Sequence, residues 1–105
     1  MTKNFYSDLV IFQKIEKLIK ETSMSLDEKE ELWKIIDEIV HHRVMGCVLE
    51  NLPREHHEEF LTKFKESPED ADLIDFLESK SGKKVSEEIK KELVKIEEEI
   101  LNDIN

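Results

Sequence analysis

Histidine is the residue type in this chain best suited to acid–base or metal chemistry near neutral pH. Its four copies form two doublets, His41-His42 and His56-His57. Adjacent residues on a helix point about 100° apart, so one doublet alone cannot chelate a metal ion well. A site would need one histidine from each doublet together with a carboxylate. The candidate metal ligands are therefore His41, His57 and Glu38.

The spacing Glu38-x-x-His41 is the unit from which di-iron helical bundles build their metal centres. Those bundles need two such units and two further inward-facing glutamates, whereas this chain contains a single unit. On a helical projection, His41 also lies about 120° from the centre of the apolar face. We therefore expect His41 to face solvent, and we expect neither a metal nor another cofactor.

Cys47 and Arg43 are the remaining candidates for chemistry, and both fall within the apolar face of the same segment. A cysteine in such a position is typically a small hydrophobic residue rather than a nucleophile. Arg43 either contacts a ligand or partner, or ties two helices together through its stem and a carboxylate; we favour the tie. The sequence has no glycine-rich phosphate loop and no zinc-type cysteine spacing, and we expect no catalytic activity.

The segment that must position these residues is 26–51, which we expect to be the long central helix. Ser25 and Glu28 match a capping box at its start. At a rise of about 1.5 Å per residue, this helix would be ~39 Å long, enough to cross a small domain. Its apolar residues recur at three and four positions: Leu32, Ile35, Ile36, Ile39, Val40, Val44, Cys47 and Val48.

Four further segments carry helical spacing, so the sequence predicts an all-α, compact bundle of about five helices in one domain, 1–105. Pro53, Ser67-Pro68 and Gly82 mark the expected boundaries between them. Residues 1–4 are expected to be a frayed end. The other expected helices are 5–21, 53–66, 68–80 and 87–104, and the last carries an apolar seam of Ile89, Leu93, Ile96 and Ile100.

The segment 5–21 has an unusually broad apolar face for its length. Such a face indicates contact with more than one neighbour or with another subunit, so this segment is either part of the bundle or a self-association arm. Its candidate partner contacts are Phe5, Tyr6, Leu9 and Phe12.

Composition narrows the class of protein further. A chain of 105 residues with two Gly and two Pro is poorly suited to the many turns of a small β fold. The single Cys excludes an internal disulfide, and neither a membrane span nor a signal peptide is indicated. We therefore expect a cytoplasmic protein that does not enter membranes.

The formal net charge of −10 is concentrated in the middle of the chain, where residues 53–78 carry nine acids against three Lys and Arg. Such a surface repels phosphate backbones, so we expect no direct nucleic-acid binding. It suits a basic partner, although acids that only keep the bundle soluble are the alternative. The candidate contacts are Glu58, Glu59, Glu69 and Asp70.

One stretch resembles a known family. Leu52-Pro53-Arg54-Glu55, Ser67-Pro68-Glu69-Asp70 and Ile74-Asp75-Phe76-Leu77 are similar to a family of short acidic all-helical proteins of unknown function from candidate-phylum bacteria. The resemblance covers about residues 26–104. It implies a helical fold and brings no activity, cofactor or site residue with it.

These observations favour a small acidic protein–protein interaction or adaptor module that is not an enzyme. Its partner would be another protein, and self-association into a homodimer is a second way of using the same surfaces. The alternative is an acidic mimic of nucleic acid that inhibits a basic DNA- or RNA-binding enzyme.

Overall fold

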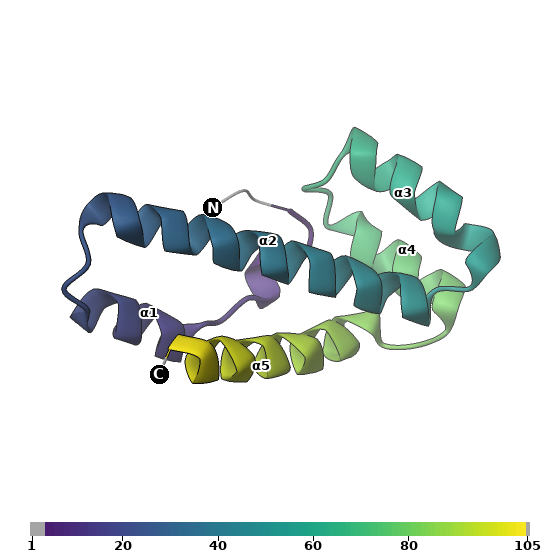
Figure 1. The fold of residues 1–105 in the computed structure, drawn as a ribbon. Helices are drawn as coiled ribbons and strands as arrows, with labels where there is room; N and C mark the ends of the chain where they lie inside the picture. The colour runs from purple at the N-terminus through teal and green to yellow at the C-terminus, as the bar shows by residue number, and fades with distance from the viewer. Residues whose placement is uncertain (1–3, 105) are drawn as a thin grey trace.

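The computed structural model describes residues 4–104 and confirms the all-α prediction (Figure 1). Five α-helices and two short 3-10 turns make up the regular structure of these residues, and they include no strand. The elements are η1 (Ser7–Leu9), α1 (Gln13–Glu21), α2 (Leu26–Asn51), η2 (Arg54–His56), α3 (His57–Glu66), α4 (Asp72–Ser81) and α5 (Val85–Ile104). The expected frayed end of residues 1–4 falls outside this range except for Asn4.

Helices α2 and α5 lie side by side along the length of an elongated molecule of 47 × 24 × 18 Å (Figure 1). The predicted seam of α5 is confirmed, because Ile89, Leu93, Ile96 and Ile100 are all buried. Side chains spaced four, three and four residues apart share one helical face, so a single stripe is enough to hold α5 against its neighbours. Helix α1 packs on α5, and at the other end of the molecule α4 packs on both α5 and α3 (Figure 1).

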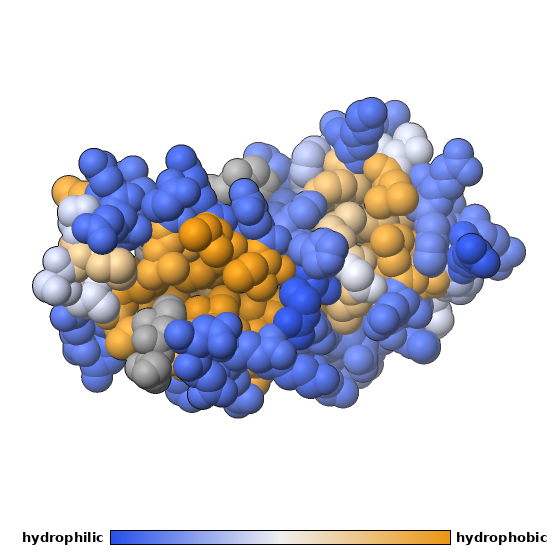
Figure 2. Space-filling view, in the orientation of Figure 1, coloured by the Kyte–Doolittle hydropathy of each residue, from blue (hydrophilic) through white to orange (hydrophobic). Residues whose placement is uncertain are grey.

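The central helix buries a narrower stripe than its sequence predicts. Ile36, Val40, Val44 and Val48 are buried, whereas Ile35 is 48% exposed and Ile39 is 39% exposed. The buried residues are spaced by four, so they form one line along the helix, and the residues beside that line have fewer neighbours. Figure 2 shows apolar surface on the face between α2 and α5.

The predicted helix ends at Ser25, Leu52 and Gly82 are confirmed. The Ser25 hydroxyl accepts a hydrogen bond from the Glu28 N–H, and the Glu28 carboxylate accepts one from the Ser25 N–H, as a capping box requires. Leu52 is extended before Pro53 and ends α2. Gly82 ends α4 with a φ of 68°, in the left-handed region that glycine enters without steric cost.

The prediction of one helix over 5–21 is wrong at its start, because α1 begins at Gln13. Side chains compete with the helical hydrogen bonds of the first residues: Ser7 Oγ accepts from the Asn4 N–H at 2.8 Å, and Asn4 Oδ1 accepts from the Tyr6 N–H at 3.0 Å. A run of β-branched and aromatic residues, 10–12, then disfavours a helix. Residues 4–12, which we call the N-terminal strap, therefore form η1 and an extended stretch.

Three other helix starts differ from the sequence prediction. Helix α3 begins at His57 rather than 53, because the residues before it form the 3-10 turn η2, in which the His56 N–H donates to the Pro53 carbonyl at 2.9 Å. Helix α4 begins at Asp72 rather than 68. Asp70 Oδ1 accepts a hydrogen bond from the Asp72 N–H at 2.9 Å, and this Asx turn competes with helical structure in the residues before Asp72. Helix α5 begins at Val85 rather than 87. Ser86 lies inside this helix, where its hydroxyl donates to the Glu78 carboxylate at 3.2 Å.

None of the helices in residues 4–104 has the length and apolar character needed to cross a lipid bilayer.

Candidate functional site

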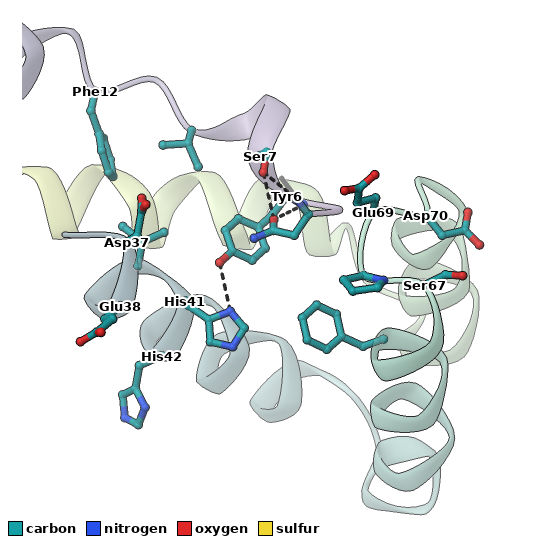
Figure 3. Close-up of a pocket in the computed structure, with 15 residues that line it drawn as sticks. Tyr6, Ser7, Phe12, Asp37, Glu38, His41, His42, Ser67, Glu69 and Asp70 are labelled. Carbon is teal, nitrogen blue, oxygen red and sulfur yellow. Dashed lines mark hydrogen bonds between the residues drawn. The ribbon is translucent and has the colours of Figure 1, made fainter. Parts of the chain in front are cut away.

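An open groove of about 980 Å³ lies where three parts of the chain meet (Figure 3). One wall is the N-terminal strap, the second is the middle of α2, and the third is the joint between α3 and α4. The lining residues are Asn4, Tyr6, Ser7, Val10, Phe12, Asp37, Glu38, Val40, His41, His42, Phe64, Ser67, Pro68, Glu69 and Asp70. We call this hollow the strap groove.

The strap is held in place by one backbone hydrogen bond and by aromatic packing. The Phe5 N–H donates to the Pro68 carbonyl at 2.8 Å, which joins the strap to the α3–α4 joint. The Phe5 ring meets Phe60 and Phe64 edge to face, with centroids 5.8 Å apart in both pairs. Edge-to-face pairs at this distance are favourable beyond their buried area, so the third wall and the strap form one packed unit.

Tyr6 connects the strap to α2. Its hydroxyl lies 3.3 Å from Nδ1 of His41, and the two atoms are hydrogen bonded (Figure 3). Burial raises the pKa of Tyr6, so its hydroxyl stays protonated at neutral pH. The His41 ring also packs near Phe64, with centroids 5.8 Å apart. His41 is exposed, as predicted, yet it has a structural partner in the chain.

Among the described residues that line the strap groove, the charged side chains are all carboxylates, with His counted as neutral. Asp37 and Glu38 come from α2, Glu69 and Asp70 come from the α3–α4 joint, and no lining residue is Lys or Arg. Burial raises the pKa of Asp37, and within residues 4–104 this carboxylate has no hydrogen-bond or ion-pair partner. In Figure 3, Asp37 and Glu69 lie on opposite sides of Tyr6.

The floor of the groove is apolar. Val40 and Phe12 are buried, with 4% and 5% of their surfaces exposed, and Val10 and Phe64 are partly buried against the same core. The strap groove therefore combines an apolar floor with a carboxylate on two of its sides. Such a surface can hold an apolar side chain whose neighbours are cationic.

The candidate metal ligands are not brought together. His41 bonds Tyr6, whereas Nε2 of His57 lies 2.7 Å from the Leu52 carbonyl oxygen at the end of α2. Glu38 lines the strap groove, away from His57. Within residues 4–104, no group of three or more His, Cys, Asp or Glu side chains has the arrangement of a metal site.

Arg43 ties α2 to α5, which was the favoured of its two interpretations. Its guanidinium lies 2.7 Å from a Glu92 carboxylate oxygen and 2.6 Å from a Glu99 oxygen. These hydrogen bonds, first Glu99 and then Glu92, raise the pKa of Arg43. The arginine therefore satisfies charges within the chain.

Cys47 is half-buried beside this pair. Burial, and then the charges of Glu92 and Glu88, raise the pKa of its thiol. The thiolate is the reactive form of cysteine, so this environment disfavours a nucleophile.

The nine candidate partner contacts divide into different environments. Phe5, Tyr6 and Phe12 are buried in the chain's own core with 3–7% of their surfaces exposed, so they are core residues that position the groove, and Leu9 is half-buried. Glu69 and Asp70 border the strap groove. Glu58 and Glu59 are exposed on α3, facing a separate shallow hollow. Arg43 belongs to the α2–α5 pair described above.

Sequence reasoning missed the groove because its walls come from distant parts of the chain. The sequence places Val40 on a helix face and Ser67 at a helix boundary, and nothing in the local spacing marks either residue, or Phe64, as part of a site. The available signal was the run Val10-Ile11-Phe12, whose residue types favour extended backbone over helix.

No protein-family model, no curated protein and no solved structure matches this chain. The resemblance to acidic helical proteins over residues 26–104 therefore stays a prediction.

Proposed function

We propose that this protein is a small acidic protein–protein interaction module without catalytic activity, and that the strap groove receives a segment of its partner. The observation that carries this proposal is the groove itself, whose apolar floor and polar rim follow the usual anatomy of an interface. A cytoplasmic location is part of the proposal, since the single Cys47 cannot form an internal disulfide.

The chemistry of the remaining side chains supports a binding role over an enzymatic one. The raised pKa of Cys47 keeps its thiol protonated. Ser25 caps α2, Ser86 donates to the Glu78 carboxylate, and His57 is bonded to a carbonyl. The second interpretation, an acidic mimic of nucleic acid, stays a prediction that rests on the net charge of −10.

A matched pair of neighbouring substitutions tests the proposal. Val10 lines the strap groove, whereas Ile11 is 67% exposed and lies outside the groove lining. Peptides selected from a random displayed library on the wild-type protein are titrated calorimetrically into Val10→Trp and Ile11→Trp. We expect Val10→Trp to weaken binding by about tenfold or more, because the indole fills the groove, and Ile11→Trp to change it little.

A second pair covers the case in which Val10→Trp fails to fold. Ser67→Trp places an indole at the third wall of the groove, and Ser79→Trp places one on the exposed surface of α4. Equal binding to both members of a folded pair would overturn the proposal, as would a library that yields no binder. Light scattering shows whether the selected peptides bind a preformed homodimer. If they do, and if both groove variants still bind them, the proposal is overturned.

A further inference from the structure

The strap groove differs in charge from the other hollows of the molecule. The hollow between α2 and α5 contains Arg43, Lys91 and Lys95 beside its acids. The hollow between α1 and α2 contains Lys20, Lys29 and Lys34, and Asp37 lines both this hollow and the strap groove. The hollow on α3 contains Lys63. In each of these three, cations of the chain lie near its carboxylates. Among the described residues that line the strap groove, there is no Lys or Arg.

Asp37 and Glu69 are the carboxylates best placed to meet a ligand. Asp37 lies on α2 next to buried Val40, and burial disfavours its charged form. Glu69 lies on the α3–α4 joint, on the other side of Tyr6 (Figure 3). Asp37, which is partly removed from water, gains more from a cation than a carboxylate in bulk solvent does, because the effective dielectric constant is lower. Glu69 is exposed, so its attraction for a cation is weaker.

Resting on the proposed function, we infer that the partner segment of the strap groove is basic: an apolar side chain seated on Val40 and Phe64, with Arg or Lys on both sides of it directed to Asp37 and Glu69. Guanidinium suits these carboxylates particularly well, because its planar donors pair with a carboxylate in a bidentate manner. An acidic or neutral segment would bring no cation to either carboxylate. The net charge of −10 adds long-range attraction to the same class of partner.

Three short peptides with blocked ends test this inference. They share one apolar centre, Leu-Phe, and differ in their flanking residues, which are Arg, Gln or Glu. Calorimetric titration at about 50 mM salt is expected to give binding of the Arg peptide at least tenfold tighter than that of the Gln peptide, and weakest binding of the Glu peptide. The preference of Arg over Gln should shrink at about 300 mM salt.

Two double variants with the same change in net charge separate the groove from the overall charge. Asp37→Asn/Glu69→Gln removes the groove pair. Glu31→Gln/Glu98→Gln removes two exposed carboxylates from α2 and α5 that line none of the hollows described above. We expect the preference for Arg over Gln to fall below about threefold in the first variant and to persist in the second.

The outcomes distinguish this inference from the proposed function. If the Arg and Gln peptides bind equally and Val10→Trp abolishes the binding of both, the proposed interaction module is supported. The inference that its partner segment is basic is then overturned. A preference for Arg that survives in Asp37→Asn/Glu69→Gln also overturns it, because the attraction is then to the overall charge. Failure of all three peptides overturns the inference, whereas the library selection described above decides the proposed function separately.

Discussion

The two sides of α2 handle charge in opposite ways. Toward α5, Arg43 lies within 2.7 Å of Glu92 and Glu99, so the chain supplies its own counter-charges. Toward the strap, Asp37 has no such partner within residues 4–104, although burial raises its pKa. The first arrangement stabilises the fold, whereas the second leaves a carboxylate in an environment that costs stability. Proteins often accept such a cost at surfaces that bind.

The largest expected effect comes from the core that supports both sides. Phe60 is fully buried and packs against the Phe5 ring of the strap. Phe60→Ala should lower the free energy of unfolding by about 3–5 kcal/mol, because it leaves a cavity beneath the strap. Urea denaturation followed by circular dichroism measures this loss. Leu61→Ala, at a neighbouring residue that is 43% exposed, is the control and should cost less than about 1 kcal/mol. Similar losses in the two variants would contradict the assignment of Phe60 to the core.

Arg43→Gln tests the side of α2 that faces α5, where Arg43 pairs with Glu92 and Glu99. The pair with Glu92 and Glu99 is partly exposed, with 33% of the Arg43 side chain accessible, so solvent screening limits its value. We expect a loss of about 1 kcal/mol at low salt that diminishes at high salt. Arg54→Gln makes the same chemical change at an exposed residue and should alter stability by less than about 0.5 kcal/mol. Equal effects of the two substitutions would show that the tie contributes nothing specific.

Tyr6→Phe tests the bond between the strap and α2. It keeps the buried ring and removes the hydroxyl that meets His41 at 3.3 Å. Because this distance is long for a hydrogen bond, the expected loss is at the low end of the usual range, about 0.5 kcal/mol. A double-mutant cycle with His41→Ala measures the coupling, and strict additivity of the two substitutions would argue against the bond.

Asp37→Asn should have the smallest effect and the opposite sign. Because the pKa of Asp37 is raised in the folded protein, the folded state holds this proton more tightly than the unfolded chain does. Wild-type stability should therefore fall as pH rises from the ordinary Asp pKa of 3.8 through the higher folded value. The Asn variant should lack this contribution and be more stable at pH 7 by a few tenths of a kcal/mol. Thermal unfolding of both proteins between pH 3 and pH 7 measures the difference, and a less stable Asn variant at neutral pH would refute it.

The sequence was most informative where structure depends on residues close in the chain. The capping box at Ser25, the left-handed Gly82 and the seam of α5 are confirmed because each follows from neighbours within one or two helical turns. Arg43 was placed on the apolar face of α2, but its partners, Glu92 and Glu99, belong to another helix and were not identified.

The strap groove could not be predicted by the same reasoning. Residues 5–12 have helical spacing, but Phe5 bonds the Pro68 carbonyl, and a periodic pattern carries no information about a partner so far along the chain. Similarly, Ile35 and Ile39 extend the apolar face of α2, yet both remain exposed because neighbouring helices cover a single line of that face. Local spacing identified which residues are apolar, and tertiary packing decided which of them are buried.

The hydrogen bond from Phe5 to Pro68 has a consequence for synthesis of the protein. Translation proceeds from the N-terminus, so Phe5 leaves the ribosome long before Phe60, Phe64 and Pro68, the residues that it contacts. Nascent segments with uncovered aromatic residues are prone to aggregation and are typical clients of chaperones. The strap can therefore reach its place in the fold only after Pro68 has left the exit tunnel.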